Sequence, residues 1–208
     1  MSAHAPVAPV EPRDAERGFD HAEAMAEAAR CFPCRCRECV KACEYLARYG
    51  SYPKRYVREI WNNDGIVMGN RKANRMIDGC TLCGLCAEIC PNDLSMGEVC
   101  LDARQSMVRR GKMPASHHDF GLRELAFYRS AEATLVRHQP GRETSAVMFF
   151  PGCQLAGSRP DHVARIYDHL STRIDGGVGL FLDCCGAPAH WAGRVELHDE
   201  IRSGFDAE

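Results

Sequence analysis

The sequence predicts an α-helical domain followed by a short α/β domain, and three observations support this fold class. Apolar residues recur at helical spacing through most of the first 140 residues. After Gln139-Pro140-Gly141 the pattern changes to strand, helix, strand, the order of a βαβ unit in a parallel sheet. Thirteen cysteines among 208 residues, most of them in tight groups, are the third observation. We therefore expect a flexible tail over 1–18, a helical domain over 19–140 and an α/β domain over 145–208.

Five segments of the first part are predicted to be helices. Ser51 and Pro53 suit the cap and early-turn proline of one helix, which carries Tyr56, Val57, Ile60 and Trp61 on one side. The other four are Asp20–Arg30, Ala73–Asp78, Glu98–Arg110 and Leu122–Arg137.

The α/β part is predicted to contain two strands, Ala146–Phe150 and Gly179–Leu182, joined by a helix that begins at Ser158. Asp161 three residues later completes a capping-box pattern. Cysteines follow both strands, at the carboxyl ends where open α/β sheets place their ligands.

The composition excludes several classes of protein. A formal net charge of −2 and 45% hydrophobic residues argue against a disordered chain and a basic nucleic-acid binder. No apolar run approaches the roughly 20 residues of a membrane span, and the N-terminus lacks the features of a secretory signal. We expect a cytoplasmic chain that meets a membrane only through a partner. Its thiols should be reduced, and their odd number also disfavours a disulfide scaffold.

The strongest chemical signal is the run Cys80-Thr-Leu-Cys83-Gly-Leu-Cys86-Ala-Glu-Ile-Cys90-Pro91. Three thiolates at intervals of three can wrap a 4Fe-4S cluster, and a fourth cysteine four residues later points to a second cluster. Structural zinc is the alternative, but zinc sites use two separated CxxC pairs, which this spacing suits poorly.

The first cysteine group is less regular, and its register stays open. Its members are Cys31, Cys34, Cys36, Cys39 and Cys43. A standard run ending at Cys43 would need a cysteine where Pro33 stands, whereas the set Cys31, Cys34, Cys39 and Cys43 leaves Cys36 spare. We prefer the second set because of a resemblance. The lead-in Glu27-Ala28-Ala29-Arg30-Cys31 resembles the N-terminal α-helical ferredoxin module of dihydropyrimidine dehydrogenase and of the glutamate synthase small subunit, which has this looser spacing. Glu44 departs from the usual proline after the fourth cysteine.

Ferredoxins with two clusters exchange the fourth cysteine between their two runs. This exchange predicts one set of Cys31, Cys34 and Cys39 (or Cys36) with Cys90, and another of Cys80, Cys83 and Cys86 with Cys43. Basic residues outnumber acidic ones between Arg30 and Arg75, which would offset the charge of the clusters. Tyrosines interleave with these cations, but helix packing explains them more simply than nucleic-acid binding, and we expect no nucleic-acid partner.

The C-terminal part resembles a known family. Phe149-Phe150-Pro151-Gly152-Cys153, followed later by Cys184-Cys185-Gly186, is similar to the CCG cysteine-rich domain of heterodisulfide reductases and of the iron-sulfur subunits of glycolate oxidase. The resemblance implies an α-helical ferredoxin-like domain followed by an incomplete βαβ CCG-type domain. It also implies a third cluster or zinc at Cys153, Cys184 and Cys185.

One departure from that family concerns the last ligands. The family adds a later CxxC, and none follows Cys185 before Glu208. We expect a fragment, because a lone βαβ unit leaves a strand edge unpaired; a degenerate site is the alternative. Cys153, Cys184 and Cys185 could also be buried small hydrophobes. Cys100 is predicted to lie in the core, and His190 at a helix start or surface.

These patterns predict an oxidoreductase or a subunit of one. Two 4Fe-4S clusters would relay electrons between a redox partner protein, such as a flavin dehydrogenase, and the CCG-type site. The alternatives are an electron-transfer-only binding subunit with a degenerate CCG site, and a structural zinc protein.

Overall fold

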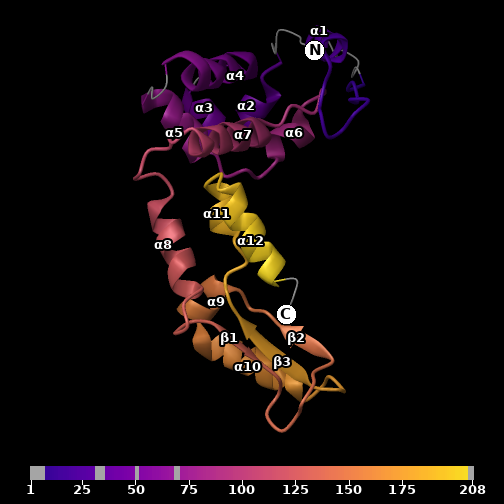
Figure 1. Ribbon diagram of the computed structural model, residues 1–208, viewed down its shortest axis with the longest axis vertical. Helices are drawn as coiled ribbons and strands as arrows, with labels where there is room; N and C mark the ends of the chain where they lie inside the picture. Colours follow the sequence, from indigo (N-terminus) through magenta and orange to yellow (C-terminus); the bar gives the residue numbers. More distant parts are fainter. Residues whose placement is uncertain (1–7, 31–35, 50–51, 68–70, 206–208) are drawn as a thin grey trace. The chain divides into compact units, whose positions relative to one another are not determined.

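A computed structural model describes residues 8–30, 36–49, 52–67 and 71–205 of the chain. Two compact units, Met1–Lys112 and Met113–Glu208, divide the molecule (Figure 1). The sequence pattern predicts the boundary near residue 140 instead. The difference arises because the helix Asp119–Tyr128 packs against the C-terminal part of the chain and the segment Leu135–Arg137 forms a strand that pairs with it. Within the described ranges, no helix is both long and apolar enough to cross a membrane.

The first unit is helical. Its elements are α1 (His21–Ala29), α2 (Glu38–Ala42), α3 (Glu44–Tyr49), α4 (Pro53–Asn62), a π-helical turn η1 (Asn63–Val67), α5 (Arg71–Gly79), α6 (Leu85–Ile89) and α7 (Met96–Arg109). Helix α7 packs against α4, α5 and α6. Ser95 caps the N-terminus of this helix: its hydroxyl accepts a hydrogen bond from the Glu98 amide at 3.1 Å. The helix buries Met96, Cys100 and Met107 at helical spacing.

The core of this unit joins α3, α4 and α5 through apolar side chains and one buried hydroxyl. Tyr56 donates from its hydroxyl to the Leu46 carbonyl at 2.6 Å, and Ile60 is buried one turn later. Trp61, expected on the same side, is 65% exposed. At about 100° per residue, Trp61 lies about 140° around the helix from Tyr56. The predicted cap Ser51 lies outside the described residues, and α4 begins at Pro53 without a side-chain cap.

The N-terminal segment hydrogen-bonds to α1. Asp20 forms the predicted helix's capping box with Glu23. Glu23 and Glu27 accept from the backbone amides of Arg13 and Val10, at 3.1 and 2.9 Å. Residues 8–18, expected to be a flexible tail, therefore have defined contacts in part.

The second unit contains α8 (Asp119–Tyr128), β1 (Leu135–Arg137), β2 (Val147–Phe149), α9 (Cys153–Ser158), α10 (Pro160–Ser171), β3 (Val178–Leu182), α11 (Ala187–Trp191) and α12 (Val195–Phe205). The strand order is β1-β3-β2, with β2 parallel and β1 antiparallel to β3. Helix α10 packs against β3 (Figure 1). Tyr167 of this helix donates from its hydroxyl to the Val178 carbonyl at 2.9 Å. The parallel pair joined by helices is the order expected from the sequence.

Two local predictions in this unit are wrong. The helix expected over Leu122–Arg137 ends at Tyr128. Residues Leu135–Arg137 form the strand β1 instead, where pairing with β3 satisfies their backbone groups. Ser158 ends α9 instead of beginning α10: its hydroxyl donates to the Gln154 carbonyl at 2.6 Å. Pro160 starts α10, where its missing amide costs nothing.

Candidate metal centre

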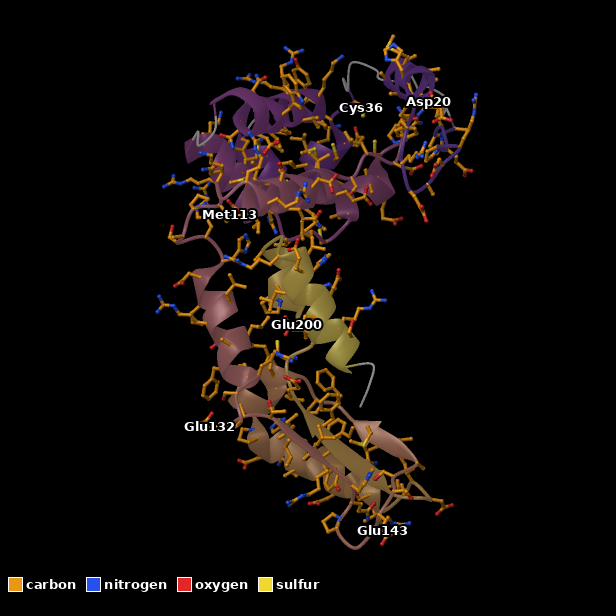
Figure 2. All side chains as sticks on the ribbon, viewed as in Figure 1. Asp20, Cys36, Met113, Glu132, Glu143 and Glu200 are labelled. Atoms are coloured by element: carbon orange, nitrogen blue, oxygen red, sulfur yellow. The ribbon has the colours of Figure 1, made fainter. Side chains whose placement is uncertain are left out.

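Cysteines from the two groups meet where α2 packs against α6. Cys36 precedes α2 (Figure 2), Cys39 lies within it, and Cys90 caps the C-terminal end of α6. These three thiols line one small cavity, together with Pro53, Ile89, Pro91 and neighbouring residues. Members of two runs that are far apart in sequence therefore share one site, as an exchanged ligand set requires.

The Cys39 thiol of this cavity favours its protonated form. Burial, followed by the nearby Cys90 and Cys36 sulfurs, raises the pKa of Cys39 to about 11. Several thiolates cannot be held close together without a cation to offset their charge. A metal or cluster that binds here must displace protons, so its affinity should rise with pH.

The second group forms a turn followed by a helix. Leu82 and Gly84 both have positive φ, at 59° and 77°, and α6 begins after them. A left-handed leucine is costly, so its presence indicates a loop shape that the surroundings fix. Cys83 is exposed, whereas Cys86 is buried and accepts from the Met96 amide at 3.2 Å. This amide belongs to the first turn of α7, whose positive end favours charge on the sulfur.

Arg104 holds the start of this loop, and sequence reasoning missed it. Its guanidinium is buried and donates to the Ile77 carbonyl at 3.1 and 2.8 Å and to the Cys80 carbonyl at 2.6 Å. The Asp78 carboxylate lies 3.9 Å away. A signal exists in the sequence: Arg104 is one turn after Cys100 on the apolar side of α7. A buried charge at such a position points to buried polar partners.

The Cys80 thiol lies among polar groups that favour its ionised form. A hydrogen bond with Cys100 lowers the pKa of Cys80, and the positive charge of Arg104 acts in the same direction. Cys100 is buried, as predicted, and its sulfur also lies 3.9 Å from the Met76 carbonyl. Burial, followed by the charge that Cys100 would carry, raises the pKa of Tyr45. Its hydroxyl is buried without a hydrogen-bond partner in the described part of the chain.

This donor set fits an iron-sulfur cluster. The Cys36, Cys39 and Cys90 thiols line one cavity. In the loop of the second group, a backbone amide donates to the Cys86 sulfur and a buried arginine holds the Cys80 carbonyl, as suits charged thiolate ligands. Among the described residues, no three His, Cys, Asp or Glu side chains are placed to hold a single metal ion. Cys31 and Cys34 lie outside the described residues, so the register of the first group stays a prediction, as does the assignment of Cys43.

The second unit brings together two of its three cysteines. Cys153 begins α9 after β2, Cys184 follows β3, and their sulfurs are 3.9 Å apart. Cys184 is buried with Leu125 and Ile201, and burial raises its pKa to about 11. Cys185 is exposed. His190 lies half-buried in α11, its ring 5.2 Å from that of His198.

Comparisons with known proteins bear on the first unit most directly. Residues 30–95 match the family described as 4Fe-4S dicluster domain. This match covers both cysteine groups of the first unit, from before Cys31 to beyond Cys90. The chain therefore carries an iron-sulfur segment of the 4Fe-4S type.

A curated relative extends the similarity. The chain is 26% identical to one subunit of the fumarate reductase (CoM/CoB) of Methanothermobacter marburgensis, over 80% of this chain and 36% of the relative. The chain thus spans about a third of that protein's length. No solved structure matches the chain. The similarities support an iron-sulfur, electron-transfer protein of the oxidoreductase-subunit type.

Proposed function

We propose that this chain is the electron-relay part of an iron-sulfur oxidoreductase. Two 4Fe-4S clusters would be held by Cys31, Cys34 and Cys39 (or Cys36) with Cys90, and by Cys80, Cys83 and Cys86 with Cys43. The observation that carries the proposal is the cavity that Cys36 and Cys39 share with Cys90, within a segment that matches a dicluster family. When bound, such clusters accept and give single electrons.

The residues around the ligands would set the properties of the relay. The Met96 amide donates to the Cys86 sulfur, and Arg104 fixes the backbone at Cys80. Hydrogen bonds and positive charge near thiolates stabilise the reduced cluster and so raise its reduction potential. The exposed Cys83 lies on the solvent side of the loop, where an electron donor or acceptor could approach.

We further propose that Cys153, Cys184 and Cys185 belong to a CCG-type site, which holds a third cluster or zinc and receives the electrons. The name of the relative, a subunit of a reductase, supports a redox partner protein. An electron-transfer-only chain with a degenerate CCG site is the second candidate. It is favoured by the buried packing of Cys184, which also suits a plain core residue.

Metal analysis of the anaerobically purified chain tests the relay. We expect about eight irons and eight acid-labile sulfides per chain. Stoichiometric zinc without sulfide would instead identify a structural zinc protein.

Single cysteine variants test the ligand assignment. Cys83→Ser should remove the spectroscopic signal of one cluster, since Cys83 is exposed and its replacement disturbs little packing. Cys185→Ser, at an exposed position of the second unit, is the control and should keep both clusters of the relay. In the first group, loss of a cluster in Cys36→Ser but not in Cys34→Ser would reverse the preferred register.

The CCG-type site has its own test. Cys185 is exposed, so Cys185→Ser should leave the fold intact. If the site binds metal, this variant loses metal beyond the eight irons of the relay. An unchanged metal content would favour the degenerate site.

A further inference from the structure

A second cavity in the first unit lies between α3 and α5. It measures about 730 Å³ and is lined by Tyr45, Arg48, Tyr49, Lys72, Arg75 and Gly79. This volume falls within the range of roughly 300–1,000 Å³ typical of small-molecule sites. None of its lining residues is an expected cluster ligand.

The charge of the cavity is positive. Arg48 comes from α3, and Lys72 and Arg75 come from α5. No acidic residue among those that the structure describes lines the cavity. In the part of the chain that the structure covers, neither Arg48 nor Arg75 has a carboxylate at ion-pairing distance. Two guanidinium groups on helices that line one cavity, without a carboxylate partner among the described residues, are suited to carboxylate or phosphate groups, which they bind through paired hydrogen bonds.

The wall of the cavity is aromatic. The rings of Tyr45 and Tyr49 meet edge to face, with centroids 5.3 Å apart, and Tyr49 also contacts Tyr56 at 6.4 Å. Their contacts hold these rings in place, so they can pack against a flat ligand at little cost in entropy. Gly79 makes room for this wall: a Cβ there would lie 3.1 Å from the Tyr45 ring.

We propose that this cavity binds a small organic anion that joins a flat ring to a phosphate or carboxylate group. The ring would pack against Tyr45 and Tyr49, and the anionic group would lie between Arg48 and Arg75. Because Gly79 directly precedes Cys80, the ligand would lie beside the second cysteine group. The cavity's volume and aromatic wall favour such a molecule over the acidic side chains of a partner protein, which would use the charges but not the rings.

Flavin mononucleotide is a suitable probe, because it carries both a flat ring and a phosphate. Riboflavin has the ring alone and inorganic phosphate the anion alone, while adenosine monophosphate tests a different ring with the same anion. Binding is measured by anaerobic calorimetry on the full chain with its iron. We expect saturable binding of at least one of the two nucleotides, at least tenfold tighter than riboflavin and phosphate.

Arginine variants locate the binding. Arg48→Gln and Arg75→Gln should each weaken nucleotide binding at least fivefold, and Tyr49→Leu should weaken it as well. Arg58→Gln, an equal change of charge at an exposed position of α4 outside the cavity, should bind like the unaltered chain. Equal weakening by Arg58→Gln, or no saturable binding of either nucleotide, would overturn the proposal. Iron content, measured in parallel, keeps this result separate from the proposed relay.

Discussion

At the scale of single residues, Arg104 is the side chain on which the loop at Cys80 depends most. Its guanidinium satisfies two carbonyls, those of Ile77 and Cys80, that would otherwise be buried without a donor. Breaking a buried charged network costs more than losing a surface pair, because the groups left behind stay desolvated.

We therefore expect Arg104→Leu to lower the free energy of unfolding by about 3 kcal/mol. Denaturant titration under anaerobic conditions measures this change. Arg109→Leu, at an exposed position of the same helix, is the matched control and should stay within about 0.5 kcal/mol of the unaltered chain. Similar losses in both variants would contradict the role of Arg104.

The Tyr45 hydroxyl gives a second prediction, because its removal should have different effects on the iron-free and the iron-loaded chain. Without a partner, a buried hydroxyl destabilises the fold, so Tyr45→Phe should stabilise the iron-free chain by about 1 kcal/mol. In the iron-loaded chain the hydroxyl can donate to a cluster sulfur, so the same variant should lower the reduction potential of one cluster, as seen in a redox titration followed by electron paramagnetic resonance.

Tyr56→Phe is the control for that experiment. The Tyr56 hydroxyl donates to the Leu46 carbonyl, so its loss should cost about 1 kcal/mol with or without iron. A reduction potential unchanged by Tyr45→Phe would show that its hydroxyl does not reach a cluster.

At the scale of elements, two serines show what local sequence can and cannot predict. Ser95 and Ser158 both precede an acidic residue by three positions, and only Ser95 caps the helix that follows. Ser158 is taken into the last turn of α9, because Cys153 already starts a helix there. The pattern is the same, and the neighbouring helix decides the outcome.

Ser95→Ala should therefore destabilise the chain by about 1 kcal/mol, whereas Ser158→Ala should have almost no effect. Thermal or denaturant unfolding measures both. Ser95→Thr keeps a cap and should restore most of the loss. If the two alanine variants behave alike, the assignment of the cap to Ser95 is wrong.

The positions of α1, α4, α5 and α7 and the parallel strand pair could be predicted because apolar spacing and strand length are local signals. The short helices α2, α3 and α6 were not predicted, since five or six residues carry too little periodicity. The strand β1 could not be predicted either, since its three residues form a strand only by pairing with β3, about 45 residues later. The candidate ligands are visible from their spacing alone. The groups that contact them, such as the Met96 amide at the Cys86 sulfur and the Arg104 guanidinium at the Cys80 carbonyl, reach this loop only through tertiary packing.

At the scale of the whole molecule, we expect iron to stabilise the short helices of the first unit more than the rest of the chain. Helices α2, α3 and α6 have five or six residues each, which is too short for stability in isolation. They need the packing that a bound cluster would strengthen, whereas α7 with 14 residues packs on three neighbours.

Removal of iron by a chelator should therefore increase amide hydrogen exchange in α2, α3 and α6 much more than in α7 or in the strands β2 and β3. Mass spectrometry of peptides from both forms measures this difference. Exchange that rises evenly across the chain would contradict it.

The contacts of Arg104 also bear on the order in which the protein acquires iron. Because it ties Cys80 to α5 and α7 through backbone carbonyls, the loop from Cys80 to Cys86 is shaped by protein contacts alone. Among the described residues, no buried cation comparable to Arg104 holds the backbone of α2 in place. We expect maturation to proceed from this prepared loop, so that limiting iron and sulfide fill the cluster of Cys80, Cys83 and Cys86 first. Electron paramagnetic resonance of partly reconstituted Cys83→Ser and unaltered chains would reveal the order, and equal filling of both sites would contradict it.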